Sequence, residues 1–310
     1  MDISTSIRIG TRDSKLALWQ AQQVKDGLEK QGFNCILVPV KSEGDLDLVT
    51  PLYAMGVEGV FTRTLDAYLL SDRIDVAVHS MKDVPVQLAK GIEQAAVLPR
   101  GNHADVLIGK DEAALQLLLD HGAAFTVATG SIRRMAQWLH RYPGHTIESL
   151  RGNIQTRLQK LRDNDWQGAI FAAASLERLG LDIPHRIELD WMLPAPAQGA
   201  VMVVCREKDE HIKTVCATLN DEVTALCVQI ERDFLSALMG GCSAPISALA
   251  TMEKERVRFK GNVLSPDGKD CIAFEETFER TAAEQIGVRA AAIVIRQGAR
   301  HIIPKLQQKD

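Results

Sequence analysis

Over roughly its first two thirds the chain alternates short apolar segments with amphipathic ones, and this alternation constrains the fold most. The segments IRIG, NCILVPV and VAVHS read as strands, with helical patterns near 14–30 and 60–70 between them. Such an order is typical of a parallel sheet covered by helices. The first helix carries a stripe of apolar residues at the spacing of a buried face, namely Ala17, Ala21, Val24 and Leu28.

A second α/β unit is expected to begin near Arg100. Strand patterns fall at about 105–109, 125–128, 146–149 and 168–172, with helices between them. After Leu193–Pro196, the apolar run AVMVVC has the pattern of another strand, which can return to the first sheet. Two segments would then cross between the domains.

From about Asp221 the pattern changes to a helix, three strands and a closing helix. Ser265-Pro266-Asp267-Gly268 is turn chemistry between the second and third strands, so we expect an antiparallel sheet with a helical cover. The predicted fold class is therefore α/β, with two α/β domains and a C-terminal α+β domain. The expected domains are 1–99 with 200–219, then 100–199, and finally 220–310.

Composition limits the classes of function. A chain of 310 residues exceeds one ordinary domain, and its net charge of −4 gives no sign of nucleic-acid binding. No apolar stretch reaches the roughly 20 residues that span a bilayer, and the N-terminus lacks the pattern of an export signal, so a cytoplasmic location is expected. The six cysteines form no CxxC pair, which argues against a metal site and a disulfide framework.

The segment Ile74–Pro85, IDVAVHSMKDVP, brings Lys82 and Asp83 to the end of a buried strand. Ligands of open α/β sheets bind beyond the carboxyl ends of such strands, so both side chains are expected to face a cleft. Asp83 can hold N–H donors or stabilise a developing cation. A structural Lys–Asp pair is an equal alternative, and His79 reads more readily as a structural histidine than as an acid or base.

Arginines recur where helices are predicted to start. A helix N-terminus with an arginine forms an anion site, and several such sites indicate a ligand with several negative charges. No GxxxxGK[ST] or GxGxxG motif is present, so several carboxylates are favoured over a nucleotide. The alternative is that each is a solvated surface residue. The arginines concerned are Arg12, Arg133, Arg134, Arg151 and Arg157.

Two other residues are candidates for ligand contact. Cys242 follows Gly240-Gly241 between a helix and a strand, a setting that leaves a thiol accessible for nucleophilic or covalent chemistry. Phe61, after Gly59, can pack on a flat ligand. For both, an inert place in the core is the alternative.

With these residues in hand, the chain resembles the porphobilinogen deaminase (hydroxymethylbilane synthase) family over nearly its full length. The resemblance rests on the order and spacing of IGTRDSKLALWQ (9–20), VAVHSMKDVP (76–85), TGSIRR (129–134), SLRGNIQTRL (149–158), LERLGL (176–181), LPAPAQGA (193–200) and GGCSAP (240–245). It implies two domains like type II periplasmic binding proteins and a third that carries a cysteine loop.

The resemblance also implies an activity and a cofactor. A dipyrromethane would be attached through a thioether to Cys242, and four porphobilinogen molecules would be condensed head to tail into hydroxymethylbilane with loss of ammonia. Asp83 would bind pyrrole N–H groups and stabilise azafulvene-like cations. The protein would be a monomer that acts in porphyrin and heme biosynthesis. The cofactor carboxylates would be held by Lys82, Thr129, Ser131, Arg133 and Arg134, and the substrate by Arg12, Ser14, Gln20, Arg151, Arg157, Arg178 and Phe61.

The chain departs from the family pattern at three positions. Ala54 and Glu58 stand where two loop lysines are usual, and Gly130 replaces a usual serine. The loop change leaves open a non-catalytic paralogue that binds anionic pyrroles. A carboxylate-binding transport protein is a more remote alternative, because it would leave Cys242 unexplained.

Overall fold

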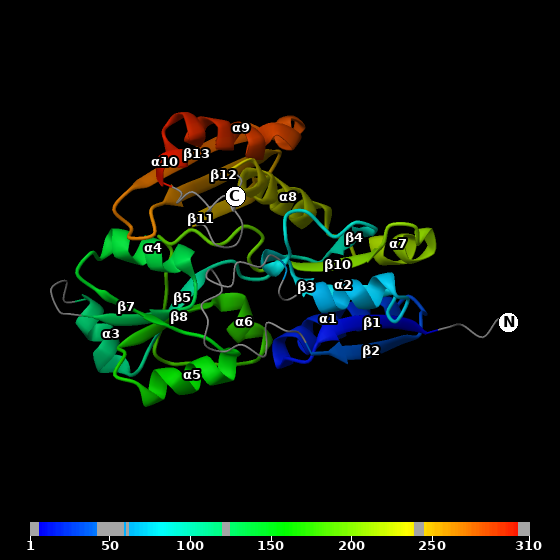
Figure 1. The fold of residues 1–310 in the computed structure, drawn as a ribbon, viewed down its shortest axis with the longest axis horizontal. Coiled ribbons are helices and arrows are strands. Elements are labelled where there is room, and N and C mark those ends of the chain that lie inside the picture. Colours follow the sequence, from blue (N-terminus) through cyan, green and yellow to red (C-terminus); the bar gives the residue numbers. More distant parts are fainter. Residues whose placement is uncertain (1–5, 42–58, 60–61, 120–124, 239–244, 303–310) are drawn as a thin grey trace, which may run out of the picture. The chain divides into compact units, whose positions relative to one another are not determined.

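The structure is a computed structural model that describes residues 6–41, 59, 62–119, 125–238 and 245–302 (Figure 1). The chain divides into two compact units. Unit 1 comprises Met1–Leu48, Val57–Gly101 and Gly199–Leu226, and unit 2 comprises Val49–Gly56, Asn102–Gln198 and Cys227–Asp310. Among the described helices, none has the length and apolar character needed to cross a bilayer.

Unit 1 is built on a five-stranded sheet in the order β2-β1-β3-β10-β4. β1 is parallel to β2 and β3, whereas β10 is antiparallel to β3 and β4. The elements are β1 (Ile7–Arg12), α1 (Lys15–Glu29), β2 (Cys35–Val40), α2 (Arg63–Leu70), β3 (Val76–Ser80), a 3-10 helix (Met81–Asp83), β4 (Ile92–Val97), β10 (Val201–Arg206) and α7 (Glu210–Ala217).

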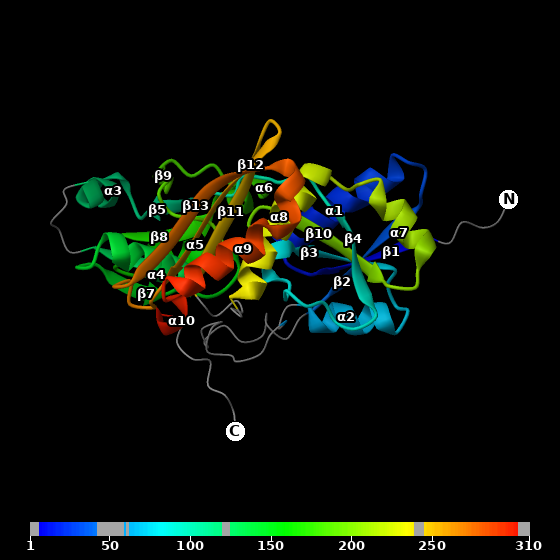
Figure 2. The ribbon, with the colours of Figure 1, turned by 90° about the horizontal axis from the view of Figure 1, so that it is seen from above.

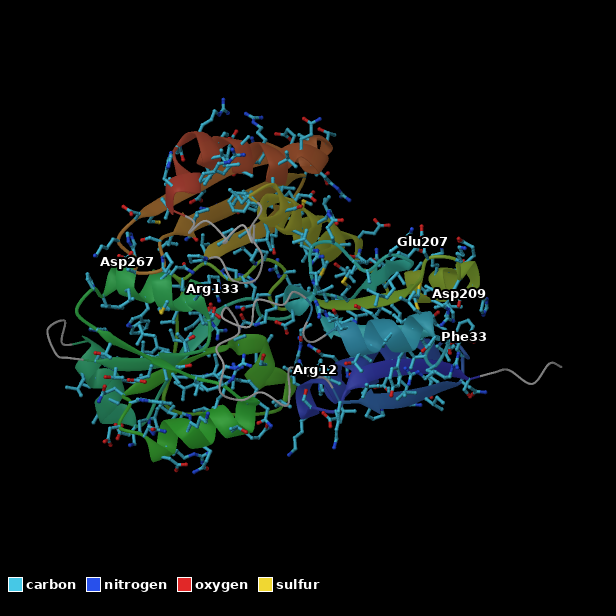
Figure 3. The ribbon with its side chains drawn as sticks, viewed as in Figure 1. Arg12, Phe33, Arg133, Glu207, Asp209 and Asp267 are labelled. Carbon is cyan, nitrogen blue, oxygen red and sulfur yellow. The ribbon has the colours of Figure 1, made fainter. Side chains whose placement is uncertain are left out.

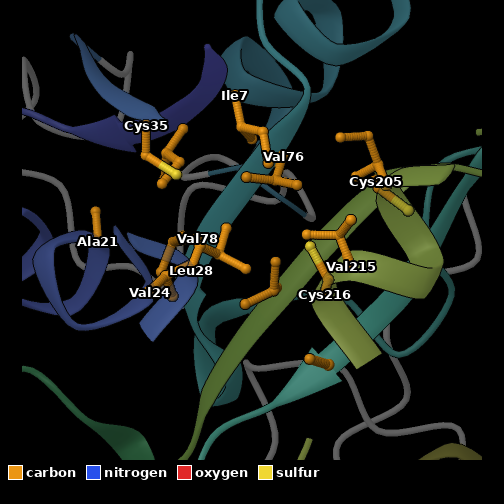
Figure 4. Close-up of a cluster of buried hydrophobic side chains, with 14 of the residues drawn as sticks. Ile7, Ala21, Val24, Leu28, Cys35, Val76, Val78, Cys205, Val215 and Cys216 are labelled. Carbon is orange, nitrogen blue, oxygen red and sulfur yellow. The ribbon is translucent and has the colours of Figure 1, made fainter. Parts of the chain in front are cut away.

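The core of unit 1 confirms the stripe expected for the first helix. Ala17, Ala21, Val24 and Leu28 are all buried, and Figure 4 shows three of them with side chains of the sheet and of α7. Ala21, Val24 and Leu28 pack with β-strand residues and with Ile212, Val215 and Cys216 in one cluster. Helices α1 and α7 therefore cover the same face of the sheet, and burial of this apolar surface stabilises the unit.

Unit 2 contains a second five-stranded sheet, in the order β7-β6-β8-β5-β9. One apolar cluster joins its strands to α5 and α6, and another joins them to α4, so helices cover both faces (Figure 1). The elements are β5 (Asp105–Gly109), α3 (Glu112–Leu119), β6 (Thr126–Thr129), α4 (Ile132–Arg141), β7 (Thr146–Ser149), α5 (Ile154–Asp163), β8 (Gly168–Ala172), α6 (Ala173–Arg178) and β9 (Arg186–Glu188).

The C-terminal part of unit 2 is the antiparallel sheet β11-β12-β13 with helices packed along it (Figure 2). Phe234 of α8 packs against Phe259 of β12 with ring centroids 5.2 Å apart. Gly268 has φ +73° in the turn between β12 and β13, as turn chemistry there predicts. The elements are α8 (Glu222–Ala237), β11 (Ile246–Glu253), β12 (Arg256–Leu264), β13 (Cys271–Glu279), a 3-10 helix (Arg280–Ala282), α9 (Ala283–Arg296) and α10 (Ala299–Ile302).

The fold class predicted from the sequence is confirmed, including the return of the chain to the first sheet through β10. The parallel pairing expected from the alternating pattern is found between β1 and both β2 and β3, whereas β10 runs antiparallel to its neighbours and β5 pairs antiparallel with β8 and β9. The short strands β4 and β9 and the helix α7 were not anticipated. Where the chain leaves and re-enters unit 1, the N–H of Gly101 donates to the carbonyl of Gly199 at 3.0 Å.

Candidate active site

Asp83 ends the 3-10 helix Met81–Asp83, which separates it from the end of β3 at Ser80. Two residues, Met81 and Lys82, therefore separate Asp83 from the end of strand β3. Met81 is fully buried, and its N–H donates to the carbonyl of Ala200 at 3.1 Å. The turn is therefore anchored, while the side chains of Lys82 and Asp83 are half-buried.

The Asp83 carboxylate accepts no hydrogen bond from any described residue and pairs with no described cation. A structural ion pair between Lys82 and Asp83, which the sequence left as an equal alternative, is not formed there. A half-buried carboxylate without a protein partner has its acceptor sites available to a ligand.

Gln20 of α1 is hydrogen-bonded to Ser80, the last residue of β3, which lies three positions before Asp83. Gln20 is buried, and its side-chain amide exchanges two hydrogen bonds with the Ser80 hydroxyl, at 2.9 and 3.1 Å. His79 is also buried, and desolvation, with a smaller contribution from the charge of Arg12, lowers its pKa to about 4. His79 is therefore neutral at physiological pH, and its Nε2 has no hydrogen-bond partner among the described residues.

Arg12 is the last residue of β1, and α1 begins three residues later at Lys15 (Figure 3). Ser14 is the N-cap of that helix, as its position predicts, and its hydroxyl accepts a hydrogen bond from the N–H of Ala17 at 3.3 Å. Arg12 thus precedes the N-terminus of α1, whose dipole favours anions.

In unit 2, Arg133 and Arg134 converge on the carboxylate of Asp105. Arg133 Nη2 donates to Asp105 Oδ2 at 2.6 Å, and Arg134 donates through Nη2 and Nε to Oδ1 at 2.8 and 3.1 Å. Gln198 Nε2 adds a fourth hydrogen bond, at 2.9 Å. Asp105 is fully buried, yet the two guanidinium groups hold its pKa well below the usual range.

Both arginines also donate to backbone carbonyls. Arg133 Nη1 donates to Leu193 O at 2.6 Å, and Arg134 Nη1 donates to Ile170 O at 3.0 Å. The Nε of Arg133 is buried and has no hydrogen-bond partner among the described residues. Burial outweighs the nearby carboxylate and lowers the pKa of Arg133. One N–H donor of a buried cation is therefore unsatisfied.

Thr129 and Ser131 form the start of α4. Ser131 is its N-cap and accepts a hydrogen bond from the N–H of Arg134 at 3.4 Å, while Thr129 Oγ1 accepts from the N–H of Ser131 at 3.2 Å. Gly130 between them lies so close to the backbone that a Cβ would stand 2.4 Å from Leu150 O. The loop is therefore packed tightly at the position where the family usually has serine.

The remaining predicted arginines of unit 2 lie around α5 and α6. Arg151 is buried just before α5, and Arg157 in its first turns donates through Nε to Gly152 O at 2.6 Å. Arg178 lies in the last turn of α6, where partial burial lowers its pKa.

The structure thus gathers the predicted residues into two sets, one in each unit. Unit 1 holds Arg12, Ser14, Gln20, Lys82 and Asp83, and unit 2 holds Thr129, Ser131, Arg133, Arg134, Arg151, Arg157 and Arg178. Cys242 and Phe61, with Ala54 and Glu58 of the divergent loop, lie outside the described residues.

Sequence reasoning missed Asp105 and Gln198, which orient the arginine pair. The available signal was an aspartate at the head of the apolar strand Asp105–Gly109. A carboxylate in such a strand is buried and needs cationic partners, and the arginines of TGSIRR had no acidic partner assigned.

Comparison with known proteins agrees with this arrangement. A family model described as porphobilinogen deaminase, dipyromethane cofactor binding domain, matches residues 7–214. A second, described as porphobilinogen deaminase, C-terminal domain, matches residues 225–295. The curated porphobilinogen deaminase of Syntrophotalea carbinolica is 39% identical over 307 residues, which cover 98% of this chain and 96% of that protein. The corresponding protein of Maridesulfovibrio salexigens is also 39% identical, over 98% and 99% of the two chains.

Solved structures with a similar backbone are more distant in sequence. The periplasmic VFT2 domain of Bordetella pertussis BvgS is 12% identical, with a TM-score of 0.42 over 69% of this chain and 86% of that one. A putative periplasmic sulfonate-binding protein of Methylobacillus flagellatus is 14% identical, with a TM-score of 0.42 over 76% and 70%. Neither likeness bears on function. The two family models and the near full-length identity to curated relatives show that the chain belongs to the porphobilinogen deaminase family.

Proposed function

We propose that this protein is a porphobilinogen deaminase, a transferase that joins four porphobilinogen molecules head to tail into hydroxymethylbilane and releases ammonia at each addition. The observation that carries the proposal is the anchored, half-buried carboxylate of Asp83, which has no partner among the described residues, in a chain that matches the family throughout. A cytoplasmic monomer that binds no nucleic acid is part of the same proposal.

A dipyrromethane carried on Cys242 fits the donor set of this chain. The unsatisfied Nε–H of Arg133 is a buried cationic donor, and a ligand carboxylate is its natural acceptor. Arg134, Ser131, Thr129 and Lys82 are the other residues proposed to hold the cofactor's acidic side chains. When bound, the dipyrromethane supplies the ring to which the first substrate is joined.

Asp83 is proposed as the catalytic residue. Loss of ammonia from porphobilinogen leaves positive charge on a pyrrole ring, and a fixed carboxylate close to that charge lowers the free energy of the transition state. The same oxygens can accept a pyrrole N–H, which orients the ring. The anchored backbone of the Met81–Asp83 turn holds the carboxylate in place without consuming its acceptor sites.

The substrate and the growing chain carry two carboxylates per ring, and the proposed ligands are accordingly cationic or polar. They are Arg12, Ser14, Gln20, Arg151, Arg157, Arg178 and Phe61. Ser14 caps α1, and Gln20 is hydrogen-bonded to Ser80. We therefore propose that these two residues both contact the substrate and hold the anion-binding segments in position.

The domain division expected from the sequence is retained as a proposal: 1–99 with 200–219, then 100–199, then 220–310. The arginine pair and the proposed cofactor cysteine then belong to different domains. The domain 100–199 and the domain 220–310 would therefore both contribute residues that hold the cofactor.

Two measurements test the proposal. The intact mass of the protein purified from a cofactor-competent host is expected to exceed the sequence mass by two pyrrole units, and Cys242→Ala is expected to remove that increment. An unmodified wild-type chain would contradict the cofactor assignment.

The second measurement is ammonia release from porphobilinogen by the holoprotein. Asp83→Asn is expected to lower turnover about 100-fold or more while the thermal transition is retained. Asp163→Asn, a change at an exposed carboxylate on α5, is the matched control and should leave turnover unchanged. Binding of porphobilinogen without ammonia release in the wild type would indicate the non-catalytic paralogue instead.

A further inference from the structure

A pocket in unit 2 is lined by residues that are not among those proposed for catalysis or ligand binding. It has a volume of about 260 Å³ and is lined by side chains of α4, of β12 and β13, and by Trp191. Of the α4 residues in its lining, His140 and Arg141 lie in the last turn, whereas Gln137 lies one turn after Arg133. A volume somewhat below that of drug-sized sites suits a ligand of one or two rings.

The walls of the pocket are fixed by contacts between α4 and the C-terminal sheet. Gln137 Nε2 donates to Leu193 O at 2.9 Å and to Ser247 Oγ at 3.0 Å. The His140 Nδ1 donates to Gly268 O at 2.7 Å, and a Cβ on Gly268 would lie 2.6 Å from the α4 backbone. The turn after β12 thus packs directly on the last turn of α4, and the pocket is preformed.

A buried acceptor in this pocket lacks a donor. Asn262 of β12 is only 9% exposed, and its Oδ1 has no hydrogen-bond partner among the described residues. Its amide nitrogen has one long contact, 3.5 Å, to Gln137 Oε1. A buried amide oxygen left unpaired costs free energy, so a ligand N–H or O–H that reaches this oxygen after a rotation of the Asn262 amide would be favoured.

The pocket also carries a cation without a counter-ion. The guanidinium of Arg141 lies 4.9 Å from the centroid of the Trp191 ring, and no described carboxylate pairs with it. No lining residue is acidic. The negative end of the α4 dipole favours a cation at this position, but that role does not require a pocket or an aromatic wall. A carboxylate in the pocket would find Arg141 held in place by stacking.

We propose that this pocket binds a small planar aromatic carboxylate that bears a ring N–H. The carboxylate pairs with Arg141, the N–H donates to Asn262 Oδ1, and the ring packs between Trp191 and Leu264. The site is separate from the proposed catalytic residues, so it does not depend on the deaminase assignment.

Cys271 supplies a local reporter of occupancy. It lines the pocket, and of the five described cysteines it alone is exposed. Partial desolvation of the Cys271 thiol raises its pKa, so alkylation with N-ethylmaleimide is best followed at mildly alkaline pH. Peptide-resolved mass spectrometry then separates Cys271 from every other cysteine, including Cys242.

The probes are indole-2-carboxylate, 1-methylindole-2-carboxylate, which lacks the donor, and indole, which lacks the anion. Indole-2-carboxylate is expected to slow alkylation of Cys271 with half-maximal protection at about 1 mM, the range expected for a ligand of this size. Each of the other two compounds is expected to bind about tenfold more weakly.

Arg141→Gln is expected to weaken protection of Cys271 about tenfold. Arg296→Gln is the matched control, because Arg296 is exposed in the last turn of α9 as Arg141 is in the last turn of α4. In Asn262→Leu, the methylated and unmethylated acids are expected to protect equally. Unchanged alkylation of Cys271, or equal protection by all three compounds in the wild type, would overturn the proposal. Retained ammonia release with lost protection in Arg141→Gln would show that this site and the catalytic site are independent.

Discussion

Removal of the Asp105 carboxylate offers a strong test of how unit 2 holds its arginine pair. In the wild type this carboxylate receives four hydrogen bonds and pairs with guanidinium groups that are 5% and 7% exposed. Asp105→Ala would leave two buried cations without their counter-ion. Breaking a buried ion pair in this way costs about 3–5 kcal/mol, against a total stability of about 5–15 kcal/mol for a folded protein.

At about 2–4 °C per kcal/mol for a unit of this size, the melting temperature is expected to fall by about 6–20 °C. Asp105→Asn is the sharper variant, because it keeps the volume of the side chain while it removes the charge and turns one acceptor oxygen into an N–H donor. Differential scanning calorimetry on the two variants and on the exposed control Asp163→Asn measures the effect. A melting temperature for Asp105→Asn within about 2 °C of the wild type would refute the reasoning.

The stability difference between the wild type and Asp105→Asn is expected to depend on pH. Because the pKa of Asp105 is lower in the folded protein than in the unfolded chain, its contribution is fully present above the unfolded value of about 3.9. Below that value the unfolded chain binds a proton that the folded protein does not, and stability is lost. The gap between wild type and Asp105→Asn is therefore expected to be constant above about pH 5 and to shrink below about pH 4.

Three further predictions concern positions outside the arginine pair. The pKa of His79 is about 4 in the folded protein, so between pH 6.5 and 4 its imidazole binds a proton mainly in the unfolded chain. Over this range the melting temperature of the wild type should therefore fall more than that of His79→Asn. Equal falls in the two proteins would contradict this. Gly130→Ala places a Cβ 2.4 Å from Leu150 O and is expected to cost about 1–3 kcal/mol in urea unfolding, whereas Gly144→Ala, with nothing within 4 Å, should be neutral. Glu231 is fully buried and accepts hydrogen bonds from two buried backbone N–H groups at 2.6 and 2.8 Å. Glu231→Ala is therefore expected to lower the free energy of unfolding by about 2–4 kcal/mol in urea. An unchanged midpoint of the urea transition would contradict this prediction.

Features encoded by neighbouring residues were predictable from the sequence. The buried stripe of α1 follows from a 3.6-residue period, the Ser14 cap follows from its place before that helix, and the turn at Gly268 follows from its composition. Each depends on contacts within a few residues, which a sequence shows directly.

Features decided by distant residues were not predictable. An apolar run such as Val201–Arg206 specifies a buried strand but not its direction, which is set by the neighbours that it joins. Asp105 acquires its role only when α4 brings two guanidinium groups to it. Likewise, the hydrogen bond between Gln20 and Ser80 joins residues 60 positions apart, and no local pattern predicts it.

The hydrogen bond between Gly101 and Gly199 places the exit and the re-entry of the chain side by side in unit 1. Everything from Asn102 to Gln198 is thus an insertion whose two ends meet, and insertions of this kind can be exchanged between proteins without breaking the host sheet. A short turn between these two glycines should leave the five strands of unit 1 with all their pairings. Unit 1 is thus a natural starting scaffold for grafting other ligand-binding modules at that point.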